Sequence, residues 1–134
     1  MIEFTIPCAA IGKGRPRVSA HGTYTPQKTR DYEQLVRLCF QRSRCAPVTD
    51  RGRALGATLT AIFRAPDSYS EKKKRELVGK PYTKKPDADN LAKAILDALN
   101  GVAYPDDAQI VKLTVRKRYG DADMVHVLIE EEQK

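Results

Sequence analysis

Alternation of apolar and polar residues predicts four strands along the chain. It occurs at residues 1–8 and 54–65, and again at 111–115 and 125–129, where the last two segments flank the turn GDAD. A period of two places alternate side chains on opposite faces of a sheet, so each segment has one face available for a core. Because only a short turn separates the last two segments, we expect them to form a hairpin at the C-terminus.

A helix is expected after a stretch that has no periodicity. Residues 9–24 contain glycine, proline and charged residues in no regular order, which predicts a mobile loop. Thr25 and Pro26 are typical of an N-cap followed by proline at the first helical position. Apolar residues then recur at i, i+3, i+4 and i+7, so we expect a helix over residues 26–44.

Two more helices are predicted in the middle of the chain. Ser70 is suited to cap a short, strongly basic helix that ends at Gly79. The next helix begins at residues 87–89, carries an apolar stripe, and ends at Asn100-Gly101, which tolerate a left-handed conformation. The order of elements predicts an α/β (α+β) fold, in which helices pack mainly on one face of a mixed β-sheet.

Length and composition favour a single soluble domain. The chain has 134 residues, of which 41 % are hydrophobic, and we expect one domain over residues 1–134. No apolar run approaches the roughly 18 residues of a membrane span, and no leader pattern precedes the first strand, so we expect a cytoplasmic protein. The three cysteines form no CxxC pair, which argues against a disulfide framework or a thiolate zinc site.

The balance of charge favours a polyanionic partner. The net charge is +7 and the pI is near 9.4, which suits nucleic acid and, less often, an anionic membrane surface. Basic residues are concentrated between residues 11 and 53 and between residues 71 and 85. We expect these segments to bind DNA through Lys13, Arg15, Arg17, Lys28, Arg30, Lys72, Lys73, Lys74, Lys84 and Lys85.

Five aspartates nevertheless gather in the stretch KPDADNLAKAILDALNGVAYPDDAQI. Asp89, Lys93 and Asp97 recur one helical turn apart, on a side distinct from the apolar stripe. Helix caps and exposed ion pairs would explain the acids at the start of the helix, and we prefer that explanation for Asp97. It does not account for Asp106-Asp107, a second acidic pair placed just before a strand.

Folding the two acidic pairs together would create a metal site. Converging carboxylates repel one another unless a divalent cation lies between them, and ligand sets made only of oxygen suit Mg²⁺ or Mn²⁺ better than zinc. Beside phosphate-binding lysines and arginines, such a metal can activate water and stabilise charge on a phosphodiester. The pattern therefore favours metal-assisted chemistry on DNA.

Other enzyme classes are disfavoured by what the sequence lacks. With only His21 and His126, there is no HExxH motif and no local histidine partner for a nucleophilic serine or cysteine. The segment GKGRPR does not have the GxxxxGK[ST] spacing of a P-loop. We therefore expect it to contact a phosphate backbone rather than a nucleotide cofactor.

The stretch KPDADNLAKAILDALNGVAYPDDAQIV resembles the signature of the RusA-type Holliday junction resolvases, in which D-x-D-N-x-x-K precedes D-D-x-Q. The segment IGKGRPRVSAHGTYTPQKTRDYE is similar, less specifically, to a basic segment of many members, which are common in phages and prophages. The resemblance implies a homodimeric, Mg²⁺-dependent endodeoxyribonuclease that makes paired nicks across a four-way junction in recombination and repair. Mn²⁺ is a possible substitute, and no nucleotide cofactor is implied.

Carried over to this chain, the resemblance assigns metal binding and catalysis to Asp87, Asp89 and Asp107, with Asp106 in reserve. It gives Lys93 a catalytic role near the scissile phosphate or the leaving oxygen. Two alternatives stay open: another branched-DNA nuclease that uses the same site, and a non-catalytic protein that binds junctions or duplex DNA.

Overall fold

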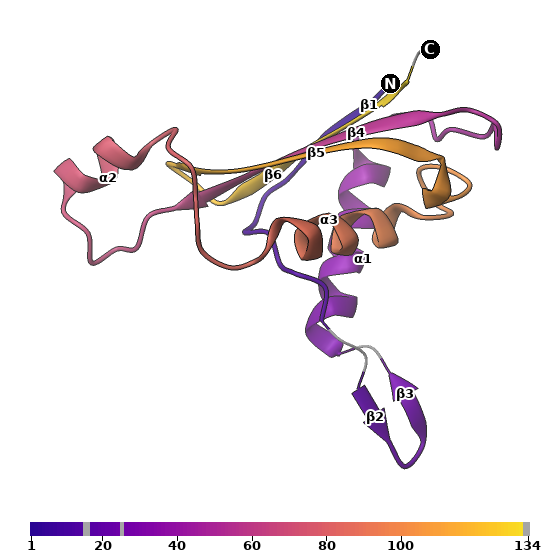
Figure 1. Ribbon diagram of the computed structural model, residues 1–134, viewed down its shortest axis with the longest axis horizontal. Coiled ribbons are helices and arrows are strands. Elements are labelled where there is room, and N and C mark those ends of the chain that lie inside the picture. The colour runs from indigo at the N-terminus through magenta and orange to yellow at the C-terminus, as the bar shows by residue number, and fades with distance from the viewer. Residues whose placement is uncertain (15–16, 25, 133–134) are drawn as a thin grey trace.

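The centre of the molecule is a four-stranded mixed sheet (Figure 1), in a computed structural model that describes residues 1–14, 17–24 and 26–132. The strands lie in the order β1-β6-β4-β5. Strand β6 is antiparallel to both β1 and β4, whereas β4 and β5 are parallel. The predicted α+β class with a mixed sheet is confirmed. The bounds are Ile2–Ile6 for β1, Leu55–Arg64 for β4, Ile110–Gly120 for β5 and Met124–Glu131 for β6.

The predicted C-terminal hairpin is wrong. β5 and β6 follow each other along the chain, but β4 lies between them in the sheet. Alternation specifies which face of a strand is buried and leaves the choice of partner open. β4 alternates buried with half-buried positions over almost its whole length, as a central strand does, whereas β5 has exposed residues on both faces and forms an edge.

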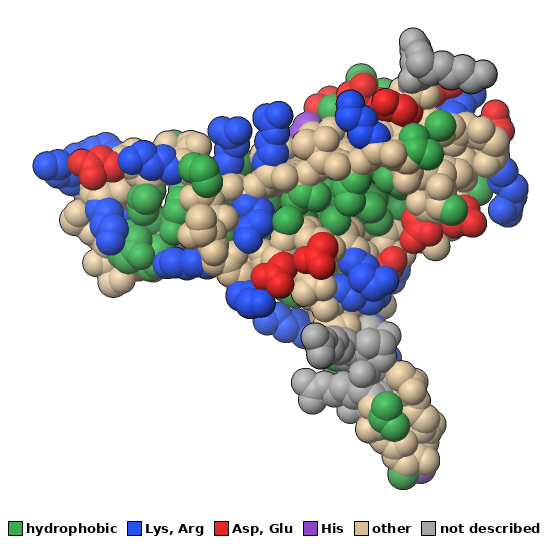
Figure 2. Space-filling model, in the orientation of Figure 1, with side chains coloured by type: hydrophobic (Ala, Val, Ile, Leu, Met, Phe, Trp, Pro, Cys, Tyr) green, Lys and Arg blue, Asp and Glu red, His purple; other side chains and the backbone are tan. Residues whose placement is uncertain are grey.

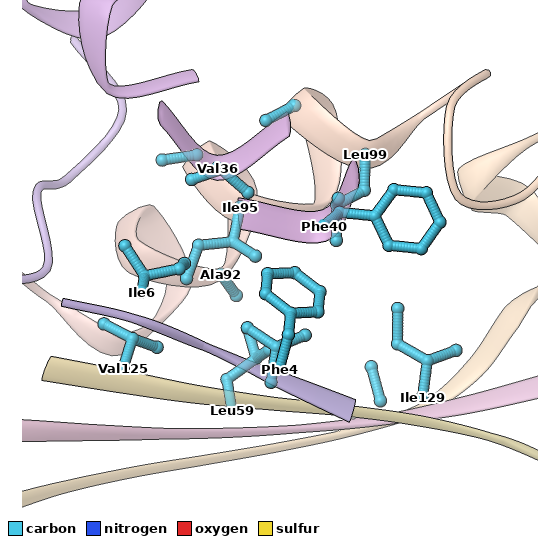
Figure 3. Close-up of a cluster of buried hydrophobic side chains, with 14 of the residues drawn as sticks. Phe4, Ile6, Val36, Phe40, Leu59, Ala92, Ile95, Leu99, Val125 and Ile129 are labelled. Carbon is cyan, nitrogen blue, oxygen red and sulfur yellow. The ribbon is translucent and has the colours of Figure 1, made fainter. Parts of the chain in front are cut away.

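Two helices cover one face of the sheet, as predicted (Figure 1). They are α1 (Gln27–Arg42) and α3 (Ala88–Leu99), which pack against each other as well as on the strands. Figure 3 shows Ile95 and Leu99 of α3 near Val36 of α1, above the inward side chains of the sheet. Burying each such aliphatic side chain stabilises the fold by about 1.5–3 kcal/mol. The apolar stripe therefore fixes the rotation of α3 and turns its polar face outward.

The boundaries of the helices agree with the local signals at several points. α2 (Glu71–Leu77) begins after Ser70, whose Oγ accepts a hydrogen bond from the backbone N–H of Lys73 at 3.1 Å. Gly79 follows it with a positive φ of 84°, a conformation that favours glycine. Pro26 is the N-cap of α1 rather than its first helical residue, and the expected cap Thr25 lies outside the described residues.

The loop predicted over residues 9–24 is in part a small hairpin. Strands β2 (Arg17–Ser19) and β3 (Gly22–Tyr24) pair with each other and project away from the sheet (Figure 1). Strands of three residues are too short to give a sequence signal from alternation. Before them, Gly14 N–H donates to Thr29 Oγ1 at 3.0 Å. A Cβ atom on Gly14 would lie 2.6 Å from that oxygen, so this close approach requires glycine.

The three cysteines, Cys8, Cys39 and Cys45, are free thiols. Burial raises the pKa of the Cys8 thiol and of the Cys39 thiol, which makes both of them weak nucleophiles.

Within the part of the chain that the structure describes, every helix is too short or too polar to cross a membrane.

Candidate active site

The outward face of α3 carries a row of acidic and basic side chains. Asp89, Lys93 and Asp97 lie one turn apart on the side opposite the buried stripe, as their spacing predicts. Lys93 Nζ is 3.7 Å from Asp97 Oδ2, and 62 % of the Lys93 side chain is exposed. The ammonium group of Lys93 is thus oriented by Asp97 and remains accessible to a ligand.

Asp87 occupies the N-cap position of α3, but its side chain makes no capping hydrogen bond. Its carboxylate instead pairs with Lys85 Nζ at 3.1 Å, in a contact exposed to solvent. Exposed pairs of this kind contribute little to stability. The positive end of the helix dipole favours a carboxylate at this position and at Asp89 in the first turn.

The second acidic pair, Asp106 and Asp107, lies in the turn between α3 and β5. Hydrogen bonds attach this turn to the end of α3. Asp107 N–H donates to Asn100 Oδ1 at 3.1 Å. The hydroxyl of the buried Tyr104 donates to the carbonyl oxygen of Leu96 at 2.7 Å. These contacts hold the turn beside the C-terminal end of α3, whereas Asp87 and Asp89 lie at its start.

Asp106 and Asp107 differ in what their carboxylates do. Asp106 is the N-cap of a short 3₁₀ turn, η1 (Asp107–Gln109), and its Oδ1 accepts the backbone N–H of Ala108 at 3.0 Å. Gln109 Oε1 accepts the N–H of Asp106 in return, at 3.1 Å, which completes a capping box. Asp106 therefore has a structural role, and Asp107 is the better candidate ligand of the pair.

The surroundings of Asp107 disfavour the charged form of its carboxyl group. Burial, the hydrogen bond with Asp106 and the charges of Asp106 and Asp97 together raise the pKa of the Asp107 carboxyl, while Lys93 lowers it. Acidic groups on α3 and on the turn thus act on one another. A cation placed among them would relieve this repulsion.

Lys13, an expected DNA contact, lies in an internal ion-pair network. Its Nζ is 3.2 Å from Glu33 Oε1 of α1 and 3.2 Å from Asp97 Oδ2 of α3. The backbone N–H of Lys13 also donates to the carbonyl of Asn90 at 3.1 Å. Lys13 therefore connects the N-terminal segment to both helices.

The other expected DNA contacts lie in two areas on either side of α3. Tyr69 joins the basic helix α2 to the segment before α3, because Lys73 Nζ lies 3.9 Å from its ring centroid and Lys84 Nζ lies 3.4 Å from its hydroxyl. Figure 2 shows Lys and Arg side chains over α2 and below the start of α3. Arg15 lies outside the described residues, and the Arg17 side chain is not described. The residues exposed or half-buried in these areas are Lys28, Arg30, Lys72, Lys73, Lys74, Lys84 and Lys85.

The family model described as endodeoxyribonuclease RusA matches residues 7–130, which include the polar face of α3 and both acidic pairs. The chain belongs to the RusA family. A relative from Bacillus subtilis (strain 168), named uncharacterized protein YqaN, is 35 % identical over 138 residues. The match covers 97 % of this chain and 96 % of that protein. The resemblance stated on the sequence is confirmed at the level of the family.

RusA-family nucleases generally depend on a divalent metal, and the donor set of this site fits one in chemistry. Asp87, Asp89 and Asp107 offer only oxygen, the ligand type of Mg²⁺, and the raised pKa of Asp107 marks a carboxyl that a cation would stabilise. The side chains do not yet converge: no group of three His, Cys, Asp or Glu side chains among the described residues could hold a metal ion. Asp87 and Asp89 lie at the start of α3 and Asp107 lies beyond its end, and the twelve residues of the helix span about 18 Å.

Sequence reasoning missed the structural roles of three residues that organise this candidate site. Lys13 pairs with Asp97, Asn100 holds Asp107, and Gln109 caps the acidic turn. Gln109 is part of the D-D-x-Q motif, so its position was visible in the sequence, whereas its partners were not. Asn100 was interpreted as a helix end, which it is, but its side chain also binds the turn.

Proposed function

We propose that this chain is a metal-dependent, structure-selective endodeoxyribonuclease that resolves four-way DNA junctions by paired symmetric nicks. The observation that carries the proposal is the exposed face of α3, where Asp89 and Lys93 precede Asp97 and the fastened turn brings Asp107 alongside. Membership of the RusA family supports endonuclease activity on DNA. The family also supports branched DNA as the substrate.

The aspartates of the site would have two roles, binding the metal and stabilising the local structure. Asp87, Asp89 and Asp107 would hold the metal, with Asp106 in reserve because its carboxylate already caps η1. A divalent cation bound there supplies Lewis-acid stabilisation of phosphodiester charge and lowers the pKa of water. Mg²⁺ is the expected ion and Mn²⁺ its substitute, since both prefer oxygen ligands.

Lys93 would act on the phosphate itself. Its ammonium group is exposed and keeps donors free beyond its contact with Asp97 at 3.7 Å. A fixed positive charge beside the reacting phosphate stabilises negative charge as it develops on the phosphate and on the leaving oxygen. Asp97 would position Lys93 and not bind the metal.

The basic areas on either side of α3 would bind the arms of the junction. Lys72, Lys73 and Lys74 on α2, with Lys84 and Lys85, form one area, and the start of α1 forms another. Contacts to phosphate position the DNA without reading its sequence. The selectivity for a branched substrate then comes from the relative placement of the two areas.

The protein would act as a homodimer, since paired nicks require two sites. The open edge of the sheet supports this. Residues 79–82 cover the end of β5 through backbone hydrogen bonds, while Val111 and Leu113 nearer its start are 61 % and 45 % exposed. Light scattering should give twice the mass of 15.0 kDa for one chain, and a monomer that still makes paired nicks would refute this part of the proposal.

The test is cleavage of a labelled synthetic four-way junction with and without Mg²⁺. Asp87→Asn, Asp89→Asn and Asp107→Asn should each abolish cleavage and leave junction binding intact or stronger, because a ligand is lost while repulsion of the DNA falls. Asp121→Asn, in the turn between β5 and β6, is the matched control with the same change in charge. Near-normal turnover by a site variant would remove that residue from the catalytic set.

A non-catalytic junction-binding protein is the second candidate, because no three carboxylates converge in the described residues. A stable complex with the junction that is not cut under any divalent ion would favour it. A different ranking of substrates, with flaps cut before junctions, would instead identify another branched-DNA nuclease.

A further inference from the structure

An arginine-bearing loop lies beside the acidic turn, outside the site described so far. β4 and β5 are parallel and start together, with Leu55 opposite Ile110, so the segments that precede them meet at one end of the sheet (right-hand end of Figure 1). The loop before β4 carries Arg51 and Arg53, and the turn before β5 carries Asp106 and Asp107.

Gln109 joins these two segments through its side chain. Its Nε2 donates to the carbonyl oxygens of Asp50 at 2.8 Å and Arg53 at 3.0 Å, so both of its N–H donors are used. Its Oε1 accepts the N–H of Asp106 at 3.1 Å. Gln109 is 9 % exposed. One buried amide therefore fixes the backbone of the arginine loop relative to the turn that presents Asp107, and a buried amide with its donors satisfied holds such a geometry firmly.

An open hollow of about 340 Å³ lies between the loop and the turn. Its lining includes Arg51, Gly52, Arg53, Asp106, Ala108 and Gln109. Figure 2 shows basic and acidic side chains close together at this end of the molecule. Arg53 Nε is 3.8 Å from Glu131 Oε1, a long and exposed contact that a stronger acceptor can replace.

The chemistry of the hollow fits a phosphodiester. A guanidinium group offers a planar fork of N–H donors that matches two oxygens of one phosphate, and two arginines come from this loop. Asp106 is the acidic residue of the lining, and its Oδ1 already accepts the N–H of Ala108. The hollow is also continuous with the turn that carries Asp107, since Asp106 lines it.

We infer that the hollow binds a backbone phosphate next to the scissile one on the same strand, and that Gln109 is the positioning residue that sets its distance from Asp107. The inference rests on the proposed function for the place of the scissile phosphate. It adds a DNA-binding subsite formed by Arg51 and Arg53.

Binding of junctions that carry one neutral methylphosphonate tests this subsite. Backbone phosphates around the cleavage position are replaced one at a time, and affinity is measured in EDTA so that no cleavage occurs. The unmodified protein should lose affinity about tenfold or more at one position adjacent to the cleavage site, as expected for loss of a charge-assisted hydrogen-bonded pair. The variant Arg51→Ala/Arg53→Ala should lose a similar factor on unmodified DNA and be indifferent to the methylphosphonate at that position.

Arg116→Ala/Arg118→Ala is the matched control, because it removes the same charge from β5. It should keep full sensitivity to the same methylphosphonate. The subsite is overturned if the Arg51→Ala/Arg53→Ala protein keeps that sensitivity, or if the sensitive position lies away from the cleavage site.

Gln109→Glu tests the positioning role, because it keeps the acceptor and removes both donors. Its thermal unfolding is measured first, and the folded protein should lose sensitivity at the adjacent phosphate while retaining it elsewhere. Rate at saturating junction should fall more than affinity, since misplacement of the strand affects the reacting geometry. A folded Gln109→Glu protein with unchanged sensitivity and rate would contradict the positioning role.

The subsite and the proposed function can fail separately. Suppose that no divalent ion supports cleavage, but that the sensitivity to one methylphosphonate is lost in Arg51→Ala/Arg53→Ala. The position of the sensitive phosphate is then counted from the centre of the junction. In that case the nuclease proposal fails and the subsite stands. If cleavage is normal and the pattern does not depend on these arginines, the subsite fails and the nuclease proposal stands.

Discussion

Replacing Lys13 with methionine should lower the free energy of unfolding by about 2 kcal/mol. Lys13 Nζ lies 3.2 Å from Glu33 Oε1 and 3.2 Å from Asp97 Oδ2, and the exposed fractions of the three side chains are 17 %, 13 % and 26 %. Methionine keeps most of the aliphatic stem but no charge. Two carboxylates then face each other without their shared cation.

The magnitude follows from the partial burial of this network. Breaking a fully buried ion pair costs about 3–5 kcal/mol, whereas an exposed pair contributes at most about 1 kcal/mol. Lys93 Nζ, 3.7 Å from Asp97 Oδ2, can offset part of the loss. An intermediate value of about 2 kcal/mol corresponds to a fall in Tm of about 7 °C for a chain of this length.

The assay is thermal unfolding followed by circular dichroism, with Lys28→Met as the matched control. Lys28 is exposed on α1, so its replacement should change stability by no more than about 0.5 kcal/mol. Junction binding is then measured well below both values of Tm, where Lys13→Met should bind nearly as well as the unmodified protein. Equal Tm values for the two variants, with much weaker binding by Lys13→Met, would refute the structural role and restore Lys13 as a DNA contact.

Two further substitutions test the site and its support. Lys93→Ala should lower the cleavage rate at saturating junction far more than it lowers affinity, because charge is stabilised where it develops in the transition state. Equal losses in rate and in affinity would show that Lys93 only binds the DNA. Tyr104→Phe removes the donor to the Leu96 carbonyl, 2.7 Å away, and should cost about 1 kcal/mol in chemical denaturation. An unchanged denaturation midpoint would show that this hydroxyl does not fasten the turn.

The helices were predictable because their signals are local. Ser70 caps α2 through a backbone group three residues away, and Gly79 ends it by its own conformation. The neighbours of β5 were not predictable in this way. Its period of two is satisfied equally by β6 beside it and by β4 beside it, and the choice depends on contacts between strands far apart in the sequence.

In the candidate site, too, local features were predictable from the sequence and long-range contacts were not. The spacing of Asp89, Lys93 and Asp97 predicts a shared helix face because it depends on one element. The role of Gln109 depends on Asp50, 59 residues away, and no pattern in the sequence indicates that pair. The motif thus predicted the candidate residues of the site, and the contacts of Asp106 and Gln109 show which of them also hold the fold.

A basic chain can gather acids on and around α3 because the fold gives most of them a positively charged partner or a hydrogen-bond donor. Lys85 pairs with Asp87, Lys13 and Lys93 share Asp97, and an N–H group binds Asp106. Asp107 differs, since burial and its acidic neighbours raise its pKa. A cation bound at Asp107 would relieve this repulsion. The loss of metal affinity should therefore be larger in Asp107→Asn than in Asp87→Asn, whose carboxylate already has the Lys85 charge.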